Sequence, residues 1–169
     1  MQKNKVYPDT RFNAEVLKKA IACTHGHYNN IRYCNRPFSS TGEMDAAILA
    51  NLNRKAGEND RLFFLGDFCK GGADQANRYR DRILCKNVHF VEGNHDRAAR
   101  KISAAFCSWN QLVEIRVGKQ GIVLCHYAMR TWHHSSRGVW HHPLSGKGAG
   151  FLGQPLQFLA PFIAGLRSI

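Results

Sequence analysis

Residues of the kinds that bind divalent metal ions recur in this sequence directly after short apolar runs. A single Asp or His in such a place is usually an ordinary turn or surface residue, so the recurrence carries the prediction. Carboxylate, amide and imidazole groups suit divalent ions of intermediate hardness, such as manganese, iron or zinc. The six cysteines include no CxxC pair, which argues against a structural thiolate zinc site. We therefore predict an open, catalytic metal site built from His25, Asp67, Asn94, His95 and His126.

Three of the preceding runs are predicted to be strands. The bulky apolar run 61–65 precedes Asp67, the run 87–91 precedes Asn94, and the run 121–125 precedes His126. Ligand sites in α/β folds collect at the carboxyl ends of strands, so these side chains are expected to meet at one edge. The stretch 20–23 before His25 is weaker, and it fits either a strand or the end of a helix that starts at Asn13.

Helical patterns separate these strands. Ser40 and Glu43 have the spacing of a capping box, and apolar residues then recur every four positions, which predicts a helix over 41–56. A second helical pattern follows Gly71, and a third one contains Ile102, Phe106 and Trp109. The runs 112–117 and 121–125 flank a turn sequence and predict a β-hairpin. Alternating strands and helices followed by a hairpin predict an α/β fold with a mixed sheet, and 169 residues suit a single domain.

The chain is strongly basic. It has 24 Lys and Arg against 12 Asp and Glu, a formal net charge of +12. This excess favours polyanionic partners such as nucleotides or nucleic acids, but the basic residues are dispersed, so a solvated surface without a partner fits equally well. The polar start without a secretory signal predicts a cytoplasmic protein with reduced cysteines. No membrane partner is expected, because the apolar segment 151–166 is short and interrupted by Gly and Pro.

The blocks Gly66-Asp67, Gly93-Asn94-His95-Asp96 and His126 resemble the successive motifs of calcineurin-like metallophosphoesterases. The resemblance spans roughly residues 23–142. Within that superfamily, the stretches 30–38 and 126–132 are similar to a small single-domain bacterial and phage subgroup. The resemblance implies a β-sandwich of mixed sheets flanked by helices, with a family-like core over about 20–142. Residues 143–169 would then form a divergent apolar tail that leaves the sandwich incomplete at its C-terminus.

The resemblance also implies a role for each site residue. Asp67 would bridge two divalent ions within about 4 Å of each other, where one can activate water. Asn94 and His126 would bind the second ion, and His25 the first. His95 would donate a proton to the leaving group of a phosphate-ester substrate, and Asp96 would hold its imidazole in the useful tautomer. Alternatively, Asp96 is the N-cap of the helix that follows.

The sequence departs from the family pattern at two places. Cys23 stands where the family has a metal-binding Asp, and it is either a thiolate ligand or an inert buried thiol. The expected Gly-His-x-His block falls on residues 144–147, which contain no histidine. Nearby histidines could substitute for the missing ones, namely His133, His134, His141 and His142.

Three functions follow from these observations. The first is a metal-dependent phosphoesterase of phosphate mono- or diesters, with activity that the two departures could impair. The second is a catalytically degenerate member that binds a phosphorylated or nucleic-acid ligand without turnover. The third is a basic nucleic-acid-binding module, which ranks last because no basic helix or aromatic platform is evident.

Overall fold

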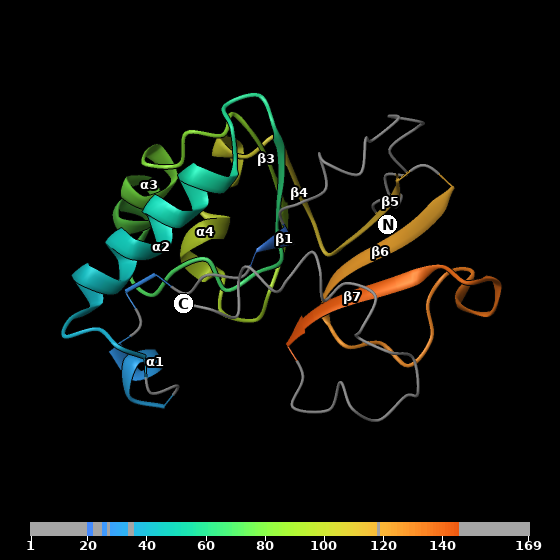
Figure 1. Cartoon of the computed structure of the whole chain (residues 1–169), viewed down its shortest axis with the longest axis horizontal. Helices are drawn as coiled ribbons and strands as arrows, with labels where there is room; N and C mark the ends of the chain where they lie inside the picture. The colour runs from blue at the N-terminus through green and yellow to red at the C-terminus, as the bar shows by residue number, and fades with distance from the viewer. Residues whose placement is uncertain (1–19, 22–24, 27, 34–35, 118, 146–169) are drawn as a thin grey trace.

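The structure, a computed structural model, describes residues 20–21, 25–26, 28–33, 36–117 and 119–145. Four parallel strands form one sheet in the order β1-β2-β3-β4 (Figure 1). Their bounds are β1 Ala20–Ile21, β2 Arg61–Phe64, β3 Asn87–Val91 and β4 Ser108–Asn110. The predictions of strands at 61–65 and 87–91 are confirmed. The stretch before His25 is also a strand at residues 20–21, and residues 22–24 lie outside the described part of the chain.

A second sheet has the order β5-β6-β7. Its strands are β5 Leu112–Val117, β6 Gln120–Tyr127 and β7 Trp140–Ser145. β5 and β6 form the predicted antiparallel hairpin, and β7 then pairs with β6 in parallel. The two sheets together confirm a mixed α/β fold. β7 includes residues 143–145, which begin the segment expected to be a divergent tail. Residues 146–169 lie outside the described part of the chain.

The helices are α1 Tyr28–Tyr33, α2 Thr41–Lys55, α3 Ala73–Asp81 and α4 Arg97–Arg100, with 3-10 turns η1 at Ser103–Ala105 and η2 at Ser135–Arg137. α2 confirms the predicted helix, because the Ser40 side chain accepts from the Glu43 N–H at 3.2 Å. The Glu43 carboxylate accepts from the backbone N–H of Ser39 at 2.8 Å, and not from that of Ser40 as in a capping box. The second helical pattern is also confirmed, since α3 buries Ala76 and Tyr79.

The prediction of a third helix through Ile102, Phe106 and Trp109 is wrong. The helical part ends at Arg100, and after a short 3-10 turn Phe106 has extended backbone angles. Trp109 then lies in β4, which pairs with β3. The apolar spacing is real, because Ile102 and Phe106 are buried, but pairing along the sheet edge determines the backbone of this segment.

Two hydrophobic cores lie on the two sides of β2. Leu62 and Phe64 belong to a core shared with the helices α2 and α3, which cover one face of the first sheet (Figure 1). Phe63 and Leu65 point to the opposite side and join a second core with residues of β5 and β6. Because side chains alternate along a strand, β2 is buried on both faces and its carboxyl end is held rigidly.

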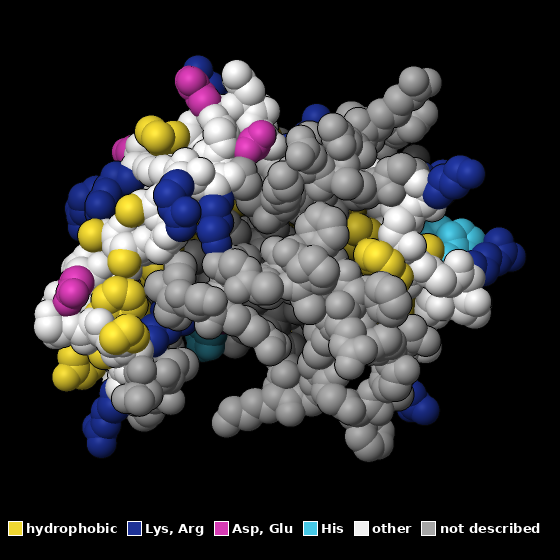
Figure 2. Space-filling view, viewed as in Figure 1, with side chains coloured by type: hydrophobic (Ala, Val, Ile, Leu, Met, Phe, Trp, Pro, Cys, Tyr) yellow, Lys and Arg dark blue, Asp and Glu magenta, His cyan; other side chains and the backbone are white. Residues whose placement is uncertain are grey.

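The basic side chains are dispersed on the face that Figure 2 shows. Figure 2 shows Lys and Arg side chains separated across the visible face instead of gathered into one stripe. Among the described residues, no helix has the length and apolar character needed to cross a bilayer.

Candidate metal and phosphoesterase site

The loop after β2 has an unusual backbone that aims Asp67 across the sheet edge. Gly66 has a φ of 83° and Asp67 a φ of 55°, so two consecutive residues adopt the left-handed conformation. A Cβ atom on Gly66 would lie 2.5 Å from Nδ1 of His126 and 2.7 Å from the backbone of Gly93. Only glycine fits here, both for its backbone angle and for the close approach of three segments.

Gly93 in the loop after β3 is restricted by the same neighbours. A Cβ atom there would lie 2.8 Å from the His126 ring and 3.0 Å from the backbone nitrogen of Asp67. The two glycines thus let the loops after β2 and β3 pack directly against the imidazole on β6. This contact joins the carboxyl ends of two parallel strands to the second sheet.

Asp67, Asn94 and His126 meet at this junction. Nε2 of His126 lies 2.9 Å from Oδ1 of Asn94 and 3.8 Å from Oδ1 of Asp67. His126 is fully buried, and its Nδ1 lies 2.7 Å from the carbonyl oxygen of Leu65. The carbonyl can only accept, so Nδ1 carries a proton and donates it.

This geometry decides what the cluster can bind. With the proton on Nδ1, the neutral imidazole presents a lone pair at Nε2 toward two oxygen acceptors. Acceptors that face one another are stabilised by a proton or a cation between them. Imidazole, amide and carboxylate ligands fit a divalent cation, and the Leu65 carbonyl supplies the outer contact that metal-bound histidines usually have.

Asp96 is 2% exposed and fastens the two loops together. Its carboxylate accepts from the backbone N–H groups of Asp67 at 2.9 Å, Phe68 at 2.8 Å and Gly93 at 2.6 Å. Burial raises the pKa of this carboxyl, against the effect of the backbone donors. Asp96 occupies the N-cap position of α4, but its side chain makes no cap bond there. Both carboxylate oxygens accept from the backbone. The contact of Asp96 with the His95 imidazole stays a prediction.

His95 lies at the exposed edge of the cluster. Its backbone N–H donates to Oδ1 of Asp67 at 3.3 Å, which ties its position to the candidate bridging carboxylate. An exposed imidazole next to the Asp67, Asn94 and His126 cluster is placed to exchange protons with a bound molecule.

His25 is fully buried and its ring contacts Phe68. Its backbone pairs with the segment after Asp67: the N–H donates to the Phe68 carbonyl at 3.1 Å, and its carbonyl accepts from Lys70 at 2.8 Å. Neither ring nitrogen has a hydrogen-bond partner among the described residues. A fully buried imidazole with an unused nitrogen fits a metal ligand.

The other expected site residues fall elsewhere. Cys23 and residues 146–147 lie outside the described part of the chain. His133 pairs with Glu114 on β5 at 2.9 Å, and His141 on β7 packs its ring against Trp132. Considering only the residues that the structure describes, no three His, Cys, Asp or Glu side chains form a metal-binding group, so the observed cluster depends on the Asn94 amide.

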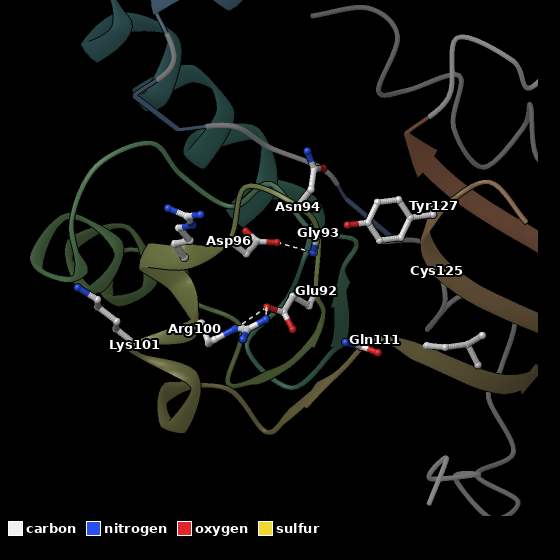
Figure 3. Close-up of a pocket in the computed structure, with 11 residues that line it drawn as sticks. Glu92, Gly93, Asn94, Asp96, Arg100, Lys101, Gln111, Cys125 and Tyr127 are labelled. Atoms are coloured by element: carbon white, nitrogen blue, oxygen red, sulfur yellow. Dashed lines mark hydrogen bonds and ion pairs between the residues drawn. The ribbon is translucent and has the colours of Figure 1, made fainter. Parts of the chain in front are cut away.

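A pocket of about 800 Å³ opens beside Asn94, between the loop after β3 and the strands β5 and β6. Figure 3 shows the Tyr127 hydroxyl pointing from β6 toward Gly93 and Asn94. Glu92 accepts from Nε of Arg100 at 2.6 Å and from the Trp109 indole at 3.2 Å, so this carboxylate is held in place. The lining includes the basic residues Arg97, Arg100 and Lys101.

A model of a known protein family matches most of the chain. The model of the calcineurin-like phosphoesterase family matches residues 19–156. The chain therefore belongs to the calcineurin-like phosphoesterases, whose members act on phosphate esters. Membership in the bacterial and phage subgroup stays a prediction.

The chain is similar to two proteins from different organisms. An uncharacterized protein of Methanocaldococcus jannaschii is 38% identical over 84 residues, which are 48% of this chain and 47% of that protein. A crystal structure of a protein of unknown function from Aquifex aeolicus superposes with a TM-score of 0.52 and 29% identity. That match covers 63% of this chain and 58% of the other. The chain thus spans about half the length of the relatives it matches.

The sequence analysis missed two residues beside His25. Asp45 on α2 and Tyr79 on α3 both contact the imidazole. Asp45 had a detectable signal, because a charged residue occupies the position after Met44 on the buried side of an amphipathic helix. Tyr79 gives no such signal, because an aromatic residue on the apolar face of a helix is typical of a core residue.

Proposed function

We propose that this chain is a metal-dependent phosphoesterase that hydrolyses phosphate mono- or diesters with two divalent ions. The convergence of acceptor atoms from Asp67, Asn94 and His126 is the observation that carries the proposal. We assign Asp67 to both ions and His25 to the ion that the other two residues do not hold. Bound manganese, iron or zinc ions would supply an activated water and neutralise phosphate oxygens.

The protein's own groups orient the reactants. His95 stands exposed beside Asp67, where its imidazole can give a proton to the leaving oxygen. Asp96 keeps the loops of Asp67 and Gly93 at a fixed separation through its bonds to both backbones. The ligands are thereby held in place before substrate arrives, which lowers the reorganisation needed for reaction.

The pocket beside Asn94 is the proposed place for the leaving group. Its volume of about 800 Å³ fits a nucleotide-sized group, and its basic lining favours an anionic one. Tyr127 offers an aromatic ring on the opposite wall. A nucleotide or a nucleic-acid terminus combines these features. We further propose that residues 1–169 are one domain in which the two sheets form the family's β-sandwich.

A second candidate is a degenerate member that binds a phosphorylated ligand without turnover. Cys23 in place of an Asp, and the absence of histidine from 144–147, favour it. Both departures concern ligands, so they would reduce metal occupancy while leaving the pocket intact. Such a protein would bind phosphate or a nucleotide and release it unchanged.

The two candidates separate in one assay series. Purified protein with added manganese is expected to hydrolyse p-nitrophenyl phosphate or its bis ester, and to lose this activity with a chelator. Asp67→Asn should abolish hydrolysis while preserving the fold, because Asn also tolerates a φ of 55°. Asp74→Asn changes an exposed carboxylate in α3 and serves as the matched control. Nucleotide binding without hydrolysis under manganese, iron and zinc would support the degenerate alternative instead.

A further inference from the structure

The His25 ring is held in one plane by two aromatic neighbours. Tyr79 stacks on it with ring centroids 4.4 Å apart and an interplanar angle of 18°. Phe68 meets it edge-on at 5.8 Å and 80°. The ring therefore cannot turn without disturbing the core, and the two nitrogens keep their directions.

Asp45 faces one of these nitrogens. Its carboxylate is 4% exposed, and Oδ1 lies 3.6 Å from Nδ1 of His25. This separation exceeds a hydrogen bond but lies within the range of a strong electrostatic interaction. A carboxylate can only accept, so it favours the tautomer with the proton on Nδ1 and the lone pair on Nε2.

Other groups hold the Asp45 carboxylate in this position. The Gly26 N–H donates to both oxygens at 3.0 Å, and the Tyr79 hydroxyl donates to Oδ2. Nε2 of Gln75 in turn donates to the Tyr79 hydroxyl oxygen at 3.2 Å. The chain of donors runs from α3 to α2 and ends on the carboxylate that faces His25.

In this tautomer, Nε2 is the acceptor atom of the His25 imidazole. It is buried and has no hydrogen-bond partner among the described residues. An acceptor buried in this way lowers stability unless a ligand satisfies it. A divalent cation is such a ligand.

We propose that Asp45 is a positioning residue that fixes His25 in the Nδ1-protonated tautomer and so directs its Nε2 lone pair to a divalent cation. The cation in this inference rests on the proposed function. The tautomer does not, because it follows from the contacts of the protein alone. Tyr79 contributes by holding both the imidazole plane and the carboxylate.

The tautomer can be measured directly in the metal-free protein. Long-range ¹H–¹⁵N NMR spectra of ¹⁵N-histidine-labelled protein distinguish a protonated Nδ1 from a protonated Nε2, and His25→Gln identifies the signal. We expect the Nδ1-protonated form in the wild type and a mixture in Asp45→Ala. Tyr79→Phe retains the ring and the Asp45 carboxylate, so it should keep the wild-type tautomer. A protonated Nε2 in the wild type, or an unchanged tautomer in Asp45→Ala, would overturn the inference.

Metal affinity gives the second readout. Titration of Mn²⁺ or Zn²⁺ into the full chain by calorimetry should show binding about 10–100-fold weaker in Asp45→Ala, the loss typical of an orienting partner of a metal ligand. If Asp45→Ala does not fold, Asp45→Asn keeps one acceptor oxygen for Gly26 while it removes the charge and replaces the other oxygen by an NH2 donor, and it should weaken binding less. Wild-type affinity in a folded Asp45 variant would contradict this inference alone. A wild-type protein that binds neither metal would contradict the proposed function, while the NMR result would still decide the tautomer.

Discussion

The two halves of the candidate site are built in different ways. Asp67, Asn94 and His126 meet because two glycines allow the loops after β2 and β3 to touch the imidazole. His25 lies in a packed interior, fixed by Tyr79 and Asp45 from two helices. The first half depends on backbone geometry and opens to solvent through Asn94 and His95, whereas the second depends on buried side chains. Substitutions should therefore damage the first half through loop strain and the second through lost orientation.

The largest expected effect concerns turnover at the exposed edge of the first half. His95→Asn should lower kcat of metal-stimulated phosphate-ester hydrolysis by about 10²–10⁴-fold, the range for loss of a general acid. Metal content should not change, because only the backbone of His95 contacts Asp67. His133→Asn, which changes an exposed imidazole in the loop after β6 that pairs with Glu114, is the control. Equal losses in both variants would show that His95 has no special role.

The next effect tests loop geometry through stability. Gly66→Ala should lower the free energy of unfolding by about 3 kcal/mol or more, because strain at positive φ adds to a clash with His126 and Gly93. Gly138 has a φ of 78°, and among the described residues no atom lies within 4 Å of a Cβ added there, so Gly138→Ala should show only the strain of about 1 kcal/mol. Gly72→Ala has neither problem and should stay within about 1 kcal/mol of wild type. Urea unfolding of the three variants measures each difference, and equal values for Gly66→Ala and Gly138→Ala would refute the close contact.

A third comparison uses the pH dependence of stability of the metal-free protein. For Asp45, burial raises the pKa, but hydrogen bonds from its neighbours outweigh burial and hold the pKa below 3.8. Its contribution to stability is therefore present above pH 3.8 and is lost as the pH falls through the lower, folded-state pKa. For Asp96, burial raises the pKa above 3.8, so stability is lost as the pH rises through that higher value.

Thermal unfolding between about pH 2.5 and 6 checks both signs. Asp45→Asn should differ from wild type most above pH 3.8 and converge on it at lower pH. The stability of Asp96→Asn relative to that of the wild type should be highest at the upper end of the range, where the wild-type carboxylate is charged and buried. If the stability difference between variant and wild type changed with pH in the same direction for both variants, the opposite pKa shifts of Asp45 and Asp96 would be contradicted.

The smallest effect concerns Cys69, which pairs with His25 in a β-bridge. Burial, together with the charges of Asp96 and Asp45, raises the pKa of the Cys69 thiol to about 11. At pH 8 the thiol should therefore resist iodoacetamide, while the exposed Cys107 reacts. Asp45→Asn or Asp96→Asn should each increase Cys69 labelling slightly, as mass spectrometry of peptides would show. Labelling of Cys69 as fast as Cys107 would contradict its burial.

Sequence patterns predicted β2, β3, the β5–β6 hairpin and two helices, because each has strong local signals. They did not predict β4 or β7, and they left the stretch before His25 open between a strand and the end of a helix. The prediction of a third helix was wrong because Trp109, although it has helical spacing from Phe106, lies in a strand whose backbone pairs with β3. Asp67, Asn94 and His126 could be predicted because each follows a buried apolar run, although His126 itself lies within β6 near its end. Asp45 and Tyr79 could not be assigned to the site, because their contact with His25 depends on how α2 and α3 pack, which no local pattern specifies.

We propose that Asp67, Asn94 and His126 form a metal-binding site that serves phosphoester hydrolysis. Elemental analysis of purified protein, after incubation with manganese and removal of free metal, tests this proposal when hydrolysis is measured on the same samples. We expect bound metal and hydrolysis in the wild type, and loss of both in Asp67→Asn. Equal metal content in the wild type and Asp67→Asn would contradict it.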